Sequence, residues 1–172
     1  MSDNVAVMRE GVIEQVADGT TIYDRPETAF VASFVGENNL FRGRVSAVDD
    51  GRATVDTGVG SIRARISTRD AGAPLRVGDP AFVFVRPESL RFADGAPGDG
   101  GLDNRIPARI RQQEFEGQFW QVFLDLPADG TQVKMAMVND GRTLDHATGA
   151  DVSLGFSADL AVALPEGPLA AE

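Results

Sequence analysis

The residues with the clearest chemical potential are a short charged run around one proline. Arg86, Pro87 and Glu88 follow a strongly apolar stretch, and their charges could bond backbone groups or each other. One interpretation is a local terminator of the preceding strand. The other is a structural signature that anchors the turn after it.

No set of side chains indicates catalysis. The sequence has one histidine, His146, and no cysteine, which excludes a two-histidine metal motif and a thiolate zinc site. It has no phosphate loop of the form G-x-x-x-x-G-K-[ST], and its only lysine, Lys134, lies in a strand-like stretch. We therefore predict no catalytic residue, no bound cofactor and no metal site within this sequence.

Charge and aromatic spacing argue against nucleic acid. The net charge is −10, although residues 40–92 hold nine arginines against six acidic residues. The aromatic group Phe115, Phe119, Trp120 and Phe123 could stack on bases, but alternation places Trp120 opposite Phe119 and Phe123. One of the two sets must then face a core, and we expect no nucleic-acid partner. The basic segment fits either a solvated surface or contact with an acidic neighbour.

The first forty residues predict a hairpin followed by helices. Two apolar runs, 4–8 and 12–16, flank Gly11, which can adopt the positive φ that a tight hairpin needs. Asp18 can cap a short helix-like turn. Pro26 then favours the start of a helix over 26–35, with Gly36 as its stop. Phe30, Val31 and Phe34 would form the apolar stripe of that helix.

After this region the hydrophobic period changes to two. Short strands separated by Asp-Gly and Val-Gly turns predict two small barrels of the partly open, five-stranded kind, or one fused pair. The first half-barrel is expected at about 40–92 and the second at about 104–165. The glycine-rich residues 93–103 are expected to be a linker or a long exposed loop. The fold class is thus mainly β, with tandem OB-like barrels.

Three stretches in this order resemble one family. The sequences "SDNVAVMREGVIEQV", "IYDRPETAFVASFVGENNLF" and "VRPESLRF" are similar to the C-terminal part of the ATP-binding subunit of ABC-type importers, with the spermidine/putrescine type as the nearest subgroup. The resemblance implies that residues 1–36 are the end of an ATPase domain. It also implies that 37–172 form a TOBE (MOP-like) regulatory domain. Its structural signature would consist of Gly36, Glu37, Asn38, Asn39, Arg86, Pro87 and Glu88.

The resemblance further implies partners and location. It predicts a homodimer formed by the regulatory domains and the N-terminal helices, with Ile22, Tyr23, Phe30 and Phe34 at the interface. Permease subunits in the membrane would be contacted through an ATPase domain upstream of residue 1, which would also bind ATP and magnesium. No apolar run is long enough to insert in a membrane, so the expected location is cytoplasmic and peripheral to the inner membrane.

This sequence alone leaves one alternative open. The barrels could form a free-standing regulator that binds a small ligand or an anion, because the middle segment is basic. In either case we expect this chain alone to lack ATPase activity. In the importers that the chain resembles, other subunits handle the solute, so we expect no solute contact among these residues.

Overall fold

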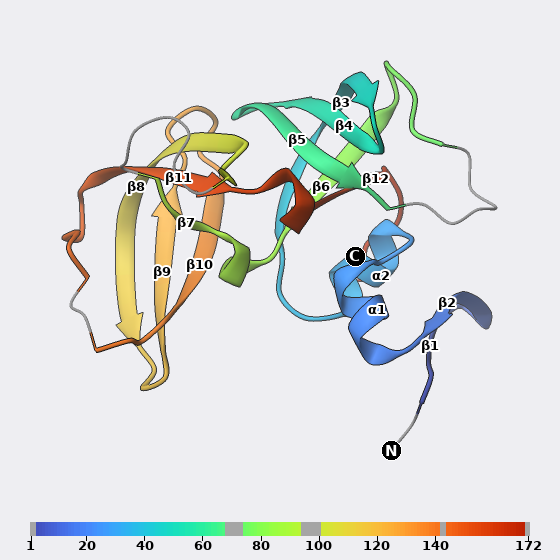
Figure 1. Ribbon diagram of the computed structural model, residues 1–172, viewed down its shortest axis with the longest axis horizontal. Coiled ribbons are helices and arrows are strands. Elements are labelled where there is room, and N and C mark those ends of the chain that lie inside the picture. The colour runs from blue at the N-terminus through green and yellow to red at the C-terminus, as the bar shows by residue number, and fades with distance from the viewer. Residues whose placement is uncertain (1–2, 68–73, 94–100, 142–143, 171–172) are drawn as a thin grey trace.

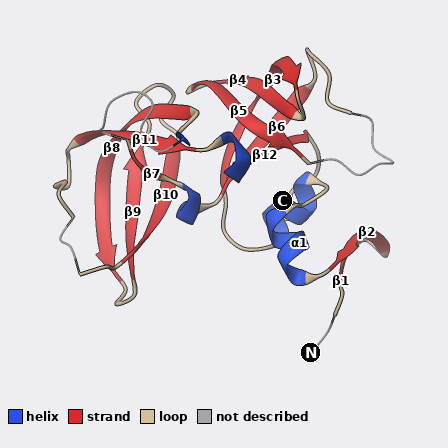
Figure 2. Cartoon of the chain, viewed as in Figure 1, coloured by secondary structure: helices blue, strands red, loops and turns tan. Residues whose placement is uncertain are grey.

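A computed structural model describes residues 3–67, 74–93, 101–141 and 144–170. The chain is built mainly from strands, which form a hairpin, a closed barrel and a second sheet (Figure 1). Two short helices lie between the hairpin and the barrel (Figure 2). In chain order, the strands and α-helices are β1 (Val5–Arg9), β2 (Val12–Ala17), α1 (Gly19–Asp24), α2 (Ala29–Phe34), β3 (Asn39–Asp49), β4 (Arg52–Thr57), β5 (Gly60–Ile66), β6 (Pro80–Val85), β7 (Arg91–Phe92), β8 (Asn104–Phe115), β9 (Phe119–Asp125), β10 (Gln132–Val138), β11 (Asp151–Phe156) and β12 (Ala161–Pro165).

The N-terminal hairpin and α1 form as the sequence predicts. Gly11 has φ of 79°, and β1 and β2 pair antiparallel on either side of the turn. The Asp18 carboxylate accepts the Thr21 backbone N–H at 3.0 Å, which caps α1. Within the described residues the hairpin pairs only with itself, so it is a separate two-stranded sheet beside the barrel.

The helix expected over 26–35 is shorter, so its predicted start at Pro26 is wrong. Helix α2 begins at Ala29 because the Thr28 hydroxyl accepts the Val31 N–H at 3.2 Å and so acts as the N-cap. Pro26 lies in the bend before it, where its carbonyl accepts the Ser67 hydroxyl at 2.7 Å. The predicted stop is confirmed, since Gly36 follows the helix with φ of 70°.

The first barrel is closed by a strand from the end of the chain. Its order is β12-β5-β4-β3-β6, and β12 pairs parallel with β5 and antiparallel with β6. The second sheet has the order β10-β9-β8-β11-β7, in which the short strand β7 pairs with β11. The two orders run through equivalent strands, so β3 corresponds to β8 and β5 to β10.

This exchange corrects the predicted limits of the half-barrels. Strand β12 was expected in the second half-barrel and belongs to the first, while β7 was expected in the first and belongs to the second. Each exchanged strand follows a one-turn 3-10 helix, η1 (Pro87–Ser89) before β7 and η3 (Ala158–Leu160) before β12. These turns carry the chain from one sheet to the other.

One continuous core joins the two sheets. A single cluster of buried side chains includes Val83 and Val85 of the first barrel and Ile106, Leu124 and Phe156 of the second sheet. The mainly β, OB-like fold class is therefore confirmed, and the buried side chains of the two sheets form one contiguous cluster.

Strand β6 is buried on both faces, as its continuous apolar sequence predicts. Val83 and Val85 face the shared core, whereas Phe82 and Phe84 pack with Ala29 of α2 on the outside of the barrel. This outer cluster attaches the helices to the barrel.

The predicted linker, 93–103, falls largely outside the described residues. Of its last residues, Asp103 accepts the Ala158 backbone N–H at 2.8 Å and so holds η3. No helix among the described residues is both long and apolar enough to cross a membrane.

Candidate functional site: the Arg86 junction and its cleft

The guanidinium of Arg86 connects the barrel to both helices. It lies at the end of β6, where the residue is only 9% exposed, and its plane stacks on the Tyr23 ring at 3.9 Å from the centroid. It donates to the carbonyl oxygens of Tyr23 at 3.0 Å, Glu37 at 3.1 Å and Val35. Burial lowers the pKa of Arg86. Arg86 thus satisfies carbonyls left free where α1 and α2 end.

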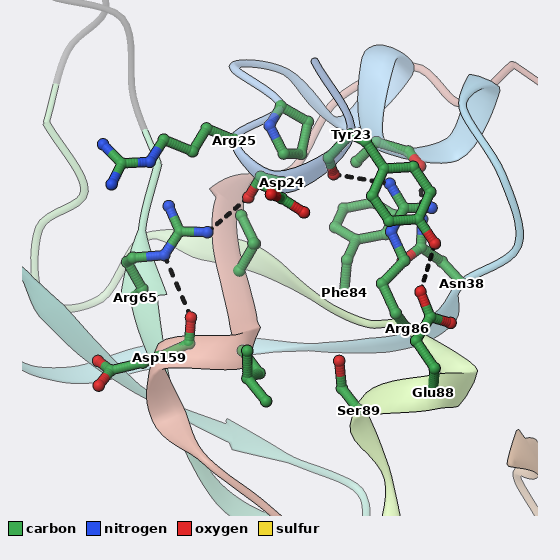
Figure 3. A pocket seen from close by; sticks show the side chains of 14 residues that line it. Tyr23, Asp24, Arg25, Asn38, Arg65, Phe84, Arg86, Glu88, Ser89 and Asp159 are labelled. Atoms are coloured by element: carbon green, nitrogen blue, oxygen red, sulfur yellow. Dashed lines mark hydrogen bonds between the residues drawn. The ribbon is translucent and has the colours of Figure 1, made fainter. Parts of the chain in front are cut away.

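Glu88 completes the junction from the other side of Tyr23. The Tyr23 hydroxyl donates a hydrogen bond to the Glu88 carboxylate (Figure 3). Burial and then this bond raise the pKa of Tyr23 above its ordinary value. Pro87, between the two charged residues, is buried and starts η1, where its fixed φ suits the first helical position.

Gly36 is required by the closeness of these side chains. A Cβ at this position would lie 3.0 Å from both the Arg86 Nη1 and a ring carbon of Tyr23, and the backbone has φ of 70°. Any other residue would be strained there and would displace the stacked pair.

The segment after Gly36 connects the helices to the second sheet. The Asn38 side chain donates to the carbonyl of Ala32 in α2. The Glu37 carboxylate pairs with the Lys134 ammonium at 2.9 Å. The Asn39 amide accepts the Lys134 N–H at 2.8 Å and donates to its carbonyl at 2.9 Å. All seven residues of the predicted signature therefore lie at one junction or next to it.

The four residues expected at an interface have different surroundings. Ile22 is 2% exposed and packs inside the chain with Val7 and Val31, so it does not reach the surface. Tyr23 belongs to the junction. Phe34 is 61% exposed and stacks on Phe30 with ring centroids 5.9 Å apart.

Sequence reasoning missed three polar residues that join segments. Gln15, 1% exposed, donates to the carbonyl of Arg25 at 3.0 Å and accepts the N–H of Glu27 at 3.0 Å. The Asn104 amide accepts the N–H of Arg63 at 2.7 Å and donates to its carbonyl at 2.8 Å. Lys134 received no role from its position in a strand. A comparison of the two halves of the sequence could have paired Asn39 with Asn104, because each begins the first strand of its half.

A cleft of about 670 Å³ opens beside the junction, between the helices and the first barrel. Figure 3 shows Arg86, Tyr23 and Glu88 at one end and Arg25, Arg65 and Asp159 at the other, with Phe84 between them. The cleft is within the size range of small-molecule sites.

Two further residues considered in the sequence analysis, His146 and Trp120, pack against aromatic rings. The His146 ring is partly buried, with its centroid 4.5 Å from that of the Phe92 ring. Trp120 faces Phe115, with ring centroids 4.9 Å apart. Among the described residues, no three histidine, cysteine or acidic side chains gather as metal ligands would.

Comparison with known proteins identifies the class. Residues 83–164 match the family described as the TOBE domain. In the solved structures, the molybdate-bound form of the cytoplasmic molybdate-binding protein ModG superposes with a TM-score of 0.65 over 74% of this chain and 96% of ModG. The sequences are 20% identical, so this likeness shows the fold alone.

Named relatives narrow the class further. The chain is 35% identical to the spermidine/putrescine import ATP-binding protein PotA of Rubrobacter xylanophilus, over 92% of this chain and 40% of that protein. It is 41% identical to PotA of Frankia alni, over 96% of this chain and 36% of the relative. The Fe(3+) ions import ATP-binding protein FbpC 2 of Rhizobium meliloti is 34% identical over 74% of this chain and 31% of its own length.

The chain therefore contains a TOBE domain, and its resemblance to the C-terminal region of an ABC importer's ATP-binding subunit is confirmed. It spans about 40% of the length of the R. xylanophilus relative.

Proposed function

We propose that this chain is the regulatory and dimerisation portion of the ATP-binding subunit of an importer for polyamines or similar small solutes. The observation that carries this proposal is the 35% identity with a spermidine/putrescine import protein across 92% of the chain. The similarity to an iron importer subunit supports the broader class of small-solute importers.

The Arg86 junction supports a regulatory role. Arg86 binds carbonyls at the ends of both helices and that of Glu37, whose carboxylate pairs with Lys134 of the second sheet. A movement of the helices would therefore be transmitted to both sheets. If the helices end an ATPase domain, as the resemblance implies, this junction would connect that domain to the barrels.

ATP binding, which the relatives' names state, is proposed to reside outside these residues, because the sequence has no phosphate loop. An ATPase domain outside these residues would also contact permease subunits and place the protein at the cytoplasmic side of the inner membrane.

Assembly as a homodimer is supported by exposed apolar residues on the hairpin and α2, of which Met8, Val12 and Phe34 are the most exposed.

The isolated chain gives a direct test. We expect no ATP hydrolysis above that of buffer and no nucleotide binding by calorimetry. Measurable turnover that persists through repeated purification would contradict the proposal.

A further inference from the structure

One end of the cleft holds the guanidinium of Arg65, and several of its N–H groups donate no hydrogen bond to the residues that the structure describes. Arg65, on β5, donates from Nη2 to the carbonyl oxygen of Asp24 at 2.6 Å and from Nε to that of Asp159 at 3.4 Å (Figure 3). Both acceptors are neutral carbonyls. Among the described residues its third nitrogen, Nη1, bonds to no acceptor, so both N–H groups of Nη1 and one of Nη2 remain available.

The charges nearby do not neutralise this cation directly. No carboxylate oxygen of a described residue lies within 4.0 Å of the Arg65 guanidinium. The Asp159 carboxylate pairs instead with Arg52 at 2.6 Å. Arg25, on the opposite wall, is exposed and forms no ion pair with any described residue.

The positive charge of Arg65 therefore has no carboxylate in contact with it among the described residues. Burial and then the charge of Arg25 lower the pKa of Arg65, while the more distant carboxylates of Asp24 and Asp159 act in the opposite direction. A partly desolvated cation beside a second cation is stabilised by an anion that bonds both.

An apolar surface adjoins this cationic end. Leu160 lines the cleft and is 48% exposed, whereas Phe84 and Val162 in the same lining are buried within the chain and leave it as the exposed apolar side chain. A ligand that is only an inorganic ion would leave this surface unused. A ligand with a charged head and an apolar body would cover it.

The cationic end is not a repeated feature of the fold. In the second sheet, Lys134 takes the place of Arg63, since each is bonded by the asparagine that begins the first strand of the other half. Two residues further, the equivalent of Arg65 is Ala136. The arginine is thus peculiar to the barrel that carries the cleft.

We propose that Arg25 and Arg65 bind the carboxylate or phosphate group of a small organic anion, whose apolar body lies on Leu160. This proposal does not depend on the importer assignment, because it concerns only groups within this chain.

Calorimetry on the 172-residue chain tests it, with phenyl phosphate, benzoate and inorganic phosphate as probes. We expect one phenyl phosphate per chain, bound roughly tenfold more tightly than inorganic phosphate because the ring covers apolar surface. Benzoate separates the two head groups: tighter binding than phenyl phosphate would assign a carboxylate, and weaker binding a phosphate. Ring signals of Tyr23, the only tyrosine, should shift when the cleft is filled.

Substitutions locate the site. Arg25→Gln, at an exposed position, should leave folding unchanged and weaken phenyl phosphate binding roughly tenfold, as should Arg65→Gln. Leu160→Ala should weaken phenyl phosphate binding while leaving inorganic phosphate binding unchanged. The matched control, Arg76→Gln, removes an exposed arginine outside the cleft and should have no effect.

Two results would overturn the proposal. One is the absence of saturable binding of phenyl phosphate and benzoate up to about 10 mM. The other is binding that Arg25→Gln and Arg65→Gln leave as tight as in the parent chain, since the anion would then be held elsewhere.

Discussion

Asn39 and Lys134 are 95 residues apart in the sequence, yet the side-chain amide of the first bonds both backbone groups of the second. Asn104 bonds Arg63 in the same way and in the opposite direction, from the second sheet to the first barrel. Each asparagine amide therefore bonds the N–H and the carbonyl of a strand residue, as the backbone of a neighbouring strand would. Together the two amides fix the sheets against each other.

Asn39→Asp should destabilise the chain by about 2 kcal/mol at neutral pH, because a carboxylate cannot donate to the Lys134 carbonyl. The loss should shrink below about pH 4, where a protonated aspartic acid can donate. Urea unfolding at several pH values measures it, and Gln118→Glu, at an exposed position, is the control. An equal loss for both variants at every pH would show that the amide bond contributes nothing.

Arg86→Ala should lower the free energy of unfolding by about 3 kcal/mol, because three carbonyls lose a charged donor and the Tyr23 ring loses its stacking partner. Arg86→Lys should recover only part of this, since an ammonium cannot reach three carbonyls from one plane. Chemical denaturation with Arg76→Ala as the matched control provides the measurement. Unchanged stability of Arg86→Ala would refute the role of the junction.

Gly43→Ala should be strongly destabilising, because its Cβ would lie 2.1 Å from the Asp56 carbonyl oxygen across the strand pair β3 and β4. Only a shift of backbone would relieve this contact, at a cost of roughly 2 kcal/mol or more. Gly19→Ala in α1 is the control, because its Cβ would meet nothing within 4 Å. That control should stabilise slightly, by up to about 1 kcal/mol. Thermal melting curves that fail to separate the two variants would contradict the strand pairing.

Tyr23 should ionise above its ordinary pKa of about 10. Because the folded-state pKa is raised above the unfolded value, the stabilisation is complete below pH 10 and is lost as pH rises from there through the folded pKa. Ultraviolet titration reads this residue alone, since the chain has one tyrosine. Glu88→Gln should bring the pKa closer to 10. A titration at 10 in the parent chain would rule out the hydrogen bond to Glu88.

Phe34→Glu should convert the proposed homodimer to a monomer, because it places a charge in the exposed apolar patch that the Phe30 and Phe34 rings form. Sedimentation equilibrium at micromolar concentration is the measurement, with Val77→Glu, another exposed apolar position, as the control. A parent chain that remains monomeric would remove the basis for dimerisation through α2.

The sequence was informative where a local signal determines a local structure. The positive φ of Gly11, the Asp18 cap and the helix stop at Gly36 were all predicted and are observed. The predicted helix start at Pro26 was wrong because the Thr28 hydroxyl caps the helix two residues later.

The parts that could not be predicted depend on contacts between distant segments. The exchange of β7 and β12 leaves both half-barrels with the same pattern of alternating strands, so periodicity cannot reveal it. Likewise, Arg86, Pro87 and Glu88 were singled out, but nothing local shows that the guanidinium reaches carbonyls 63, 51 and 49 residues away.

The most direct test of the importer assignment replaces the corresponding C-terminal region of the R. xylanophilus relative with this chain and measures uptake of labelled spermidine. We predict uptake close to that of the unaltered relative, and strongly reduced uptake when the inserted chain carries Arg86→Ala. A folded chimaera that hydrolyses ATP and assembles in the membrane, yet imports no spermidine and no related solute, would contradict the account.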